Sequence, residues 1–239
     1  RANAYGDPGT AYQSGREFIH ILSQVDPDLH LAVEQKKPFD WSTYQAHYFL
    51  INGRSAPDSV SPNDAAWLPS QPYGSMVHVR EQSQLTGDGG DTGAALVRYI
   101  NVMPTDAAFH PHGNNGTVIG RDGHPLESAT GQDLSYEKFA VDIGPGQTWD
   151  VLFEWFDAEH YDKDTNPVPV TGPQVANQVF GMFYSGSPYL GENGTLPPGQ
   201  QTLNQCGEFY IIAHNHALYQ ITSWGVNMTG PITYSRRSD

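Results

Sequence analysis

Four of the ten histidines form two His-x-His pairs: His110 with His112, and His214 with His216. Residues two positions apart on a β-strand point to the same face, so each pair can direct two imidazole rings at one point. Imidazole binds copper, zinc, iron and nickel, and the affinity order among divalent ions favours copper. If the two pairs lie on neighbouring strands, the sequence predicts a four-histidine metal site. Zinc is the alternative on ligand type alone.

Six further histidines stand alone, and we interpret them as surface or hydrogen-bonded structural residues: His20, His30, His47, His78, His124 and His160. The single cysteine, Cys206, excludes an intrachain disulfide and a CxxC zinc motif. The sequence contains no GxSxG motif, no Walker loop and no GxGxxG motif after a strand, so hydrolase, nucleotide-hydrolysing and dinucleotide-dependent activities have no support. We assign no catalytic side chain.

The charge balance excludes further classes of function. The 239 residues include 12 Lys and Arg against 26 Asp and Glu, which gives a formal net charge of −14. So few cations do not provide the basic footprint of a nucleic-acid-binding protein. No apolar run approaches the roughly 18 residues of a membrane-spanning helix. We therefore expect neither a nucleic-acid partner nor a membrane span.

Short strands separated by turn residues are the elements that must position these histidines. Aromatic and β-branched runs predict strands at 16–22, 47–51, 75–80, 94–102, 117–119, 149–155, 179–184, 208–213, 218–223 and 232–234. This spacing is typical of an all-β Greek-key sandwich or barrel. We assign the β-domain to residues 44–239 and interpret residues 1–43 as an extended lead-in that links it to a preceding domain.

The two histidine pairs belong to a wider pattern. Together with residues 48–55 (YFLINGRS), 118–123 (VIGRDG) and 144–153 (GPGQTWDVLF), they resemble a cupredoxin domain of a multicopper oxidase. The resemblance runs from Tyr44 to the C-terminus and implies a cupredoxin-like fold. Residues 16–28 resemble the link that leaves a preceding cupredoxin domain.

The resemblance also implies a cofactor. In this family a trinuclear copper centre of type 2 and type 3 ions lies between two domains and reduces dioxygen to water. The resemblance implies that one domain's half of that centre is supplied by His110, His112, His214 and His216. Another cupredoxin domain or subunit must then supply the remaining ligands. Because each ligating histidine needs a partner for its other ring nitrogen, Asn114, Asp122 and Asn215 are candidates for that role.

A second copper site of the family is missing from the sequence. A type 1 copper takes electrons from the substrate through His, Cys, His and a weak axial Met. At the matching positions this chain has Ala107, Asn215 and Gln220, with Gly225 near the axial position. The resemblance therefore implies that electrons enter at a type 1 copper elsewhere, and we expect this chain alone to be inactive.

We interpret the chain as a copper-binding domain or subunit of a multicopper oxidase, working outside the cytoplasm: extracellular, periplasmic or at the cell surface. The alternative is a non-catalytic cupredoxin-like structural or metal-binding module of a larger extracellular assembly. The two differ in pairing, since an oxidase needs further histidine ligands and a cysteine motif from another segment or chain. A zinc or copper enzyme that uses only these four histidines is a third reading, and it would need an open coordination position and a general base.

Overall fold

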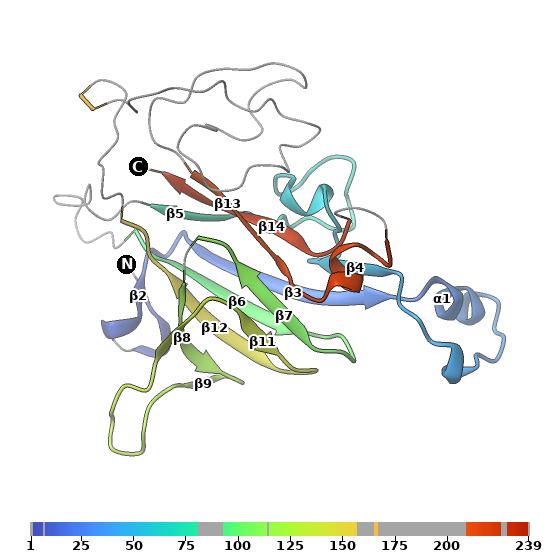
Figure 1. The fold of residues 1–239 in the computed structure, drawn as a ribbon, viewed down its shortest axis with the longest axis horizontal. Coiled ribbons are helices and arrows are strands. Elements are labelled where there is room, and N and C mark those ends of the chain that lie inside the picture. Colours follow the sequence, from blue (N-terminus) through green and yellow to red (C-terminus); the bar gives the residue numbers. More distant parts are fainter. Residues whose placement is uncertain are drawn as a thin grey trace.

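A computed structural model describes residues 2–6, 8–80, 93–113, 115–156, 165–166, 209–225 and 229–238. In these ranges two curled β-sheets pack against each other, as Figure 1 shows. The predicted all-β sandwich is confirmed. Cys206, His160 and the predicted strand 179–184 lie outside the described residues.

The larger sheet has the strand order β10-β8-β12-β6-β3-β4, with β9 paired to β8. Its strands are β3 (Glu17–Val25), β4 (Tyr48–Ile51), β6 (Ala95–Asn101), β8 (Gly116–Arg121), β9 (His124–Pro125), β10 (Tyr136–Lys138) and β12 (Thr148–Phe153). β3 pairs in parallel with β6 and antiparallel with β4. It is thus a strand of this sheet although it falls within the lead-in 1–43; the domain boundary itself stays a prediction.

The smaller sheet has the order β11-β7-β13-β14-β5. Its strands are β5 (Val77–Arg80), β7 (Ala107–Pro111), β11 (Val141–Ile143), β13 (Phe209–Asn215) and β14 (Ile232–Ser238). β13 pairs antiparallel with both β7 and β14. The two segments that carry the His-x-His pairs are therefore neighbours, which is the condition for the predicted four-histidine site.

Alternation of side chains builds the core between the sheets. Along β7 the buried positions alternate with half-buried ones, as expected for a strand that covers the core with one face. Phe109 of β7 packs against Tyr99 of β6, with ring centroids 5.1 Å apart. β6 is buried almost throughout because both of its faces are covered.

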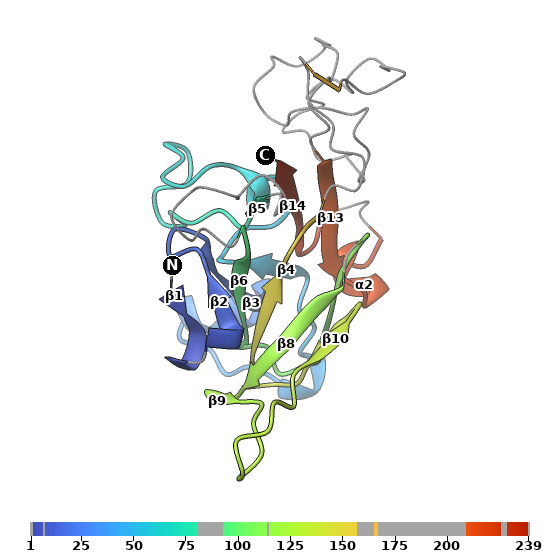
Figure 2. The same cartoon turned by 90° about the vertical axis from the view of Figure 1, so that its left-hand side faces the viewer.

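The N-terminal segment provides the second cover of β6. It consists of β1 (Ala2–Asn3), η1 (Ala4–Gly6), η2 (Pro8–Thr10) and β2 (Ala11–Tyr12). Figure 2 shows β1 and β2 beside the larger sheet. Ala4 and Tyr12 form an apolar cluster with Leu96, Ile119 and Leu152 of that sheet. This segment therefore closes the outer face of the sandwich.

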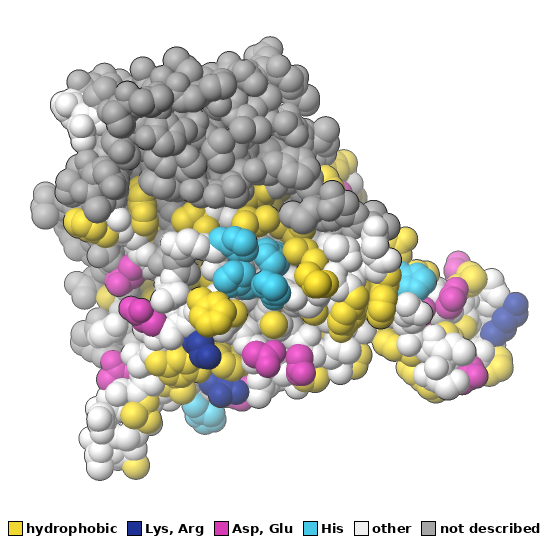
Figure 3. Space-filling model, viewed as in Figure 1, with side chains coloured by type: hydrophobic (Ala, Val, Ile, Leu, Met, Phe, Trp, Pro, Cys, Tyr) yellow, Lys and Arg dark blue, Asp and Glu magenta, His cyan; other side chains and the backbone are white. Residues whose placement is uncertain are grey.

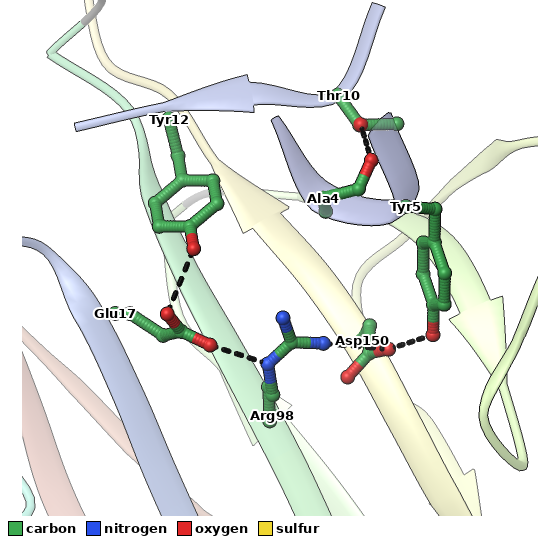
Figure 4. A network of polar contacts seen from close by, with 7 residues as sticks. All are labelled: Ala4, Tyr5, Thr10, Tyr12, Glu17, Arg98 and Asp150. Carbon is green, nitrogen blue, oxygen red and sulfur yellow. Dashed lines mark hydrogen bonds and ion pairs between the residues drawn. The ribbon is translucent and has the colours of Figure 1, made fainter. Parts of the chain in front are cut away.

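A chain of polar contacts fastens the same segment (Figure 4). Arg98 of β6 lies between two carboxylates, with Nε 2.6 Å from Glu17 and Nη1 3.1 Å from Asp150. The Tyr12 hydroxyl donates to Glu17 at 2.7 Å, and the Tyr5 hydroxyl donates to Asp150. Burial, together with the Asp150 carboxylate, raises the pKa of Tyr5 to about 12. Both tyrosines thus remain protonated donors at neutral pH.

Among the described residues the α-helices are short: α1 (Pro27–Glu34) and α2 (Leu218–Ile221), with 3₁₀ turns η3 (Trp41–Thr43) and η4 (Asp58–Val60). The predicted strand 218–223 is wrong, since these residues begin with α2. The reason is local, because the backbone N–H groups of Gln220 and Ile221 both donate to the Ala217 carbonyl and start a helical turn. In the described part of the chain, neither helix has the length and apolarity needed to cross a bilayer.

Candidate metal centre

The ladder between β7 and β13 brings the two His-x-His pairs together at the ends of these strands. His214 lies directly opposite His110 in the register. The backbone N–H of His112 donates to the Ile212 carbonyl at 2.9 Å, and that of His216 donates to the Ala108 carbonyl at 2.7 Å. We call the resulting group the histidine cluster: His110, His112, His214 and His216.

The four rings lie close to one another at the surface. Ring centroids within the histidine cluster are 4.6 to 5.8 Å apart in the five measured pairs. Nε2 of His112 lies 2.9 Å from Nε2 of His214, a hydrogen-bond distance at which one of the two nitrogens donates to the other. In Figure 3 histidine side chains form a continuous patch on the face that is in view.

Backbone carbonyls orient two of the rings through their other nitrogen. Nδ1 of His110 lies 2.7 Å from the Phe139 carbonyl oxygen, and Nδ1 of His214 lies 3.0 Å from the Asn215 carbonyl oxygen. A neutral imidazole carries one N–H, so donation from Nδ1 leaves a lone pair on Nε2. Metal-binding histidines are commonly held in this way.

The surroundings of two of the rings favour their neutral form. Burial lowers the pKa of His214, and the neighbouring rings of the cluster lower it further. Burial also lowers the pKa of His112, with His110 and His216 adding to the effect. Because only the deprotonated nitrogen binds a metal, both effects favour metal binding at neutral pH.

The donor atoms fit a shared metal site. Imidazole nitrogens bind zinc at about 2.0–2.1 Å, so two of them on one ion would lie about 3 Å apart. This matches the 2.9 Å between the Nε2 atoms of His112 and His214. Within the described ranges, no group of three or more His, Cys, Asp or Glu side chains is arranged around a single ion.

No protein-family model and no curated protein matches this sequence. Among solved structures, the multicopper oxidase mgLAC is 18% identical with a TM-score of 0.49, and the blue copper oxidase from Nitrosomonas europaea is 15% identical with a TM-score of 0.49. Both similarities cover 92% of this chain and 43% of the other chain. McoA from Aquifex aeolicus is 12% identical over 94% of this chain and 29% of that one, with a TM-score of 0.43.

The chain is structurally similar to multicopper oxidases. At these identities the similarity concerns the fold, and it extends over most of the chain. The chain spans less than half the length of these structures, 43% at most among the three named. The all-β sandwich expected from the sequence is confirmed by the two packed sheets themselves.

Two positions at which the sequence resemblance implied type 1 copper ligands are occupied by a pair of amides. Asn215 and Gln220 are both fully buried, and the Asn215 Nδ2 group donates to Gln220 Oε1. Ala107, at the third position, is also fully buried. The described structure therefore has no imidazole or thiolate at these three positions.

The predicted partners of the ligand histidines have different outcomes. Asn215 does serve His214, but through its backbone carbonyl. The Asp122 carboxylate instead accepts from the backbone N–H of Thr148 in the turn after β8. Asn114 lies outside the described residues. The carbonyl that holds His110, at Phe139, was missed because every residue type carries a backbone carbonyl and the sequence gives no signal for it.

The remaining described histidines lie apart from the cluster. His20 is buried in the core, where its Nε2 lies 2.8 Å from the Ser75 carbonyl oxygen. His30, His47 and His124 are exposed, and His78 is half-buried. These positions agree with the interpretation of isolated histidines as structural or surface residues.

A groove of about 690 Å³ begins at one member of the cluster, His216. Asp106, Asp142 and Tyr219 line it, and both carboxylates are exposed. The groove therefore gives solvent access to one side of the histidine cluster.

Proposed function

We propose that this chain is a copper-binding domain or subunit of a multicopper oxidase. In this proposal the histidine cluster supplies half of a trinuclear copper centre, which reduces dioxygen to water. The electrons come from a substrate that is oxidised at a type 1 copper elsewhere. The single observation that carries the proposal is the convergence of four imidazoles at the ends of β7 and β13, with two Nε2 atoms 2.9 Å apart.

The protein's own groups would hold and orient the metal. His112 and His214 direct Nε2 atoms at one point, while the Phe139 and Asn215 carbonyls fix the rings of His110 and His214 through Nδ1. The lowered pKa of His112 and of His214 would reduce competition from protons. Bound copper would supply the electron transfer to dioxygen, for which the side chains here have no redox group of their own.

A second cupredoxin domain or subunit is part of the proposal. In the described residues two Nε2 atoms face one point and no third ligand joins them, so the metal needs ligands from another source. Large apolar side chains beside the cluster are exposed, with Phe139 at 63% and Leu218 at 71%. Exposed apolar groups around a polar centre are typical of an interaction surface. We also propose that the chain works outside the cytoplasm, as its likeness to multicopper oxidases suggested from sequence.

Copper(II) titration of the purified chain tests the metal site. We expect binding with an EPR signal of nitrogen-ligated copper, which the double variant His112→Ala/His214→Ala loses. The affinity should fall by at least about 100-fold, since even groups outside the ligand set cost about 10–100-fold when removed. His124→Ala is the matched control, because His124 is exposed and lies outside the cluster. Equal copper affinity in the wild type and the double variant would refute the proposal and favour the structural module.

Oxygen consumption tests the need for a partner. The copper-loaded chain alone is expected to consume no oxygen with a phenolic electron donor. Steady oxygen reduction by the isolated chain would contradict the half-site and point to a complete enzyme.

A further inference from the structure

Between the two histidines of the second pair lies Asn215, whose side chain points away from the cluster into the protein. Asn215 and Gln220, which lies five positions later in the chain, both have 0% exposed surface. Two uncharged amides at this depth must satisfy their hydrogen bonds internally, because an unpaired buried polar group costs about 1–3 kcal/mol. Their partners therefore show what the pair connects.

The contacts form a directed relay of hydrogen bonds. The Ala217 backbone N–H donates to Asn215 Oδ1 at 3.1 Å, and Asn215 Nδ2 donates to Gln220 Oε1. Gln220 Nε2 then donates to the Asp106 carbonyl at 3.3 Å and to the Tyr219 hydroxyl at 2.8 Å. A backbone N–H can only donate and a carbonyl can only accept, so the two ends fix the orientation of both amides.

The relay joins the end of β13 to the start of β7. Asp106 directly precedes β7, which carries His110, while Asn215 is the last residue of β13. The ladder pairs Asn215 with Phe109, and the His216 N–H donates to the Ala108 carbonyl. The amide relay connects the same two strand ends through side chains.

Close packing holds the far side of the relay. Any Cβ at Gly230 would overlap the Gln220 carbonyl oxygen, so the chain before β14 lies directly on α2. The Gly230 N–H also donates to the Ile221 carbonyl at 3.0 Å. α2 is therefore fixed on β14, and Gln220 extends from a rigid base towards Asp106.

We propose that Asn215 and Gln220 are positioning residues that hold His214 and His216 in register with His110 and His112. The metal-binding part of this inference rests on the proposed function. The relay requires amides at both positions. A carboxylate at 220 would be buried as a charge and would set an oxygen against the Asp106 carbonyl.

Gln220→Glu and Gln220→Met test the inference in the full chain. Both keep the side-chain length, and the methionine variant removes the hydrogen bonds without burying a charge, so it serves if the glutamate variant does not fold. Each should weaken copper(II) binding about 10–100-fold and alter the copper EPR spectrum. Asp26→Ala is the control for general destabilisation, since Asp26 is 3% exposed, accepts three backbone N–H bonds and belongs to the α1 cap. It should leave copper affinity and the spectrum unchanged.

Hydrogen exchange on the metal-free chain separates this inference from the proposed function. In Gln220→Met the backbone N–H of His216 should exchange at least about tenfold faster than in the wild type, because its local opening costs less. The N–H of Ile51, which lies in β4 of the larger sheet and donates to the Arg54 carbonyl, should be unchanged. A wild-type chain that binds no copper overturns the proposed function alone. Unchanged exchange at His216, or unchanged copper affinity and spectrum in a folded Gln220 variant of a copper-binding chain, overturns the positioning role.

Discussion

His20 and the histidine cluster place the same side chain in opposite settings. His20 is 1% exposed, its Nε2 lies 2.8 Å from the Ser75 carbonyl oxygen, and its ring packs 5.4 Å from that of Tyr99. In the cluster, the backbone carbonyls instead hold Nδ1 of His110 and His214. The two settings therefore use different ring nitrogens. His20 donates from Nε2 to the Ser75 carbonyl, whereas His214 bonds to the backbone through Nδ1 and its Nε2 faces the ring of His112.

The two settings also separate stability from binding. The backbone bond and the aromatic packing make His20 part of the core, where its ring contacts Tyr99 and Phe109. The cluster lies at strand ends, where His112 and His216 are exposed and contribute little packing. We therefore expect changes at His20 to alter the free energy of unfolding, and changes in the cluster to alter metal affinity.

The largest effect is expected from His20→Ala. Loss of a buried ring and of its hydrogen bond should lower the free energy of unfolding by about 3–4 kcal/mol. Copper(II) affinity at pH 7 should stay within about twofold of the wild type, since the metal-facing nitrogens are untouched. His112→Ala should show the reverse, with a stability change within about 0.5 kcal/mol. Urea unfolding gives the free energy of unfolding of both variants, and copper titration gives their affinity. A large loss of copper affinity in His20→Ala would contradict the separation of stability from binding.

Acid sharpens it. Burial lowers the pKa of His20 from 6.5 to about 4. Between pH 6.5 and pH 4 the imidazole of His20 gains a proton in the unfolded chain but not in the folded chain. The contribution of the neutral His20 ring to the free energy of unfolding is therefore complete above pH 6.5 and is lost as the pH falls to 4. The difference amounts to about 3 kcal/mol. His20→Gln keeps an N–H for the Ser75 carbonyl and does not titrate, so its unfolding free energy should fall less over this range. Parallel pH curves for the two proteins would show that His20 is not held neutral.

Much of this comparison was accessible from sequence, and part of it was not. The His-x-His spacing and the strand pattern predicted which residues meet, because strand geometry places alternate side chains on one face. The strand predicted at 218–223 was wrong, since the backbone N–H groups of Gln220 and Ile221 donate to the Ala217 carbonyl and start a helical turn, which the run of residue types did not indicate. The contact between His110 and the Phe139 carbonyl could not be predicted from the sequence either. Backbone partners depend on the assembled sheets and not on residue type.

Copper itself should stabilise the chain through the cluster alone. At a free copper(II) concentration of about 100 times the dissociation constant, binding to the folded state raises the free energy of unfolding by about 2.7 kcal/mol. That corresponds to a rise of about 5–10 °C in the unfolding temperature of a domain of this size. Calorimetry should find the same rise in His20→Gln and none in His112→Ala/His214→Ala. A rise that survives the double variant would place the metal at other residues.

The smallest predicted effect on the free energy of unfolding concerns the polar contacts that hold the N-terminal segment on the larger sheet. Tyr5→Phe removes the hydroxyl that donates to Asp150, which is 5% exposed and keeps Arg98 at 3.1 Å. Because the ion pair remains, we expect a loss of about 1 kcal/mol in the free energy of unfolding, measured in urea. Copper affinity should be unchanged, since this segment packs on the outer face of the larger sheet and the cluster lies on the smaller one. A shift in copper affinity would show that the two sheets respond as a unit, and the separation of stability from binding would then not hold.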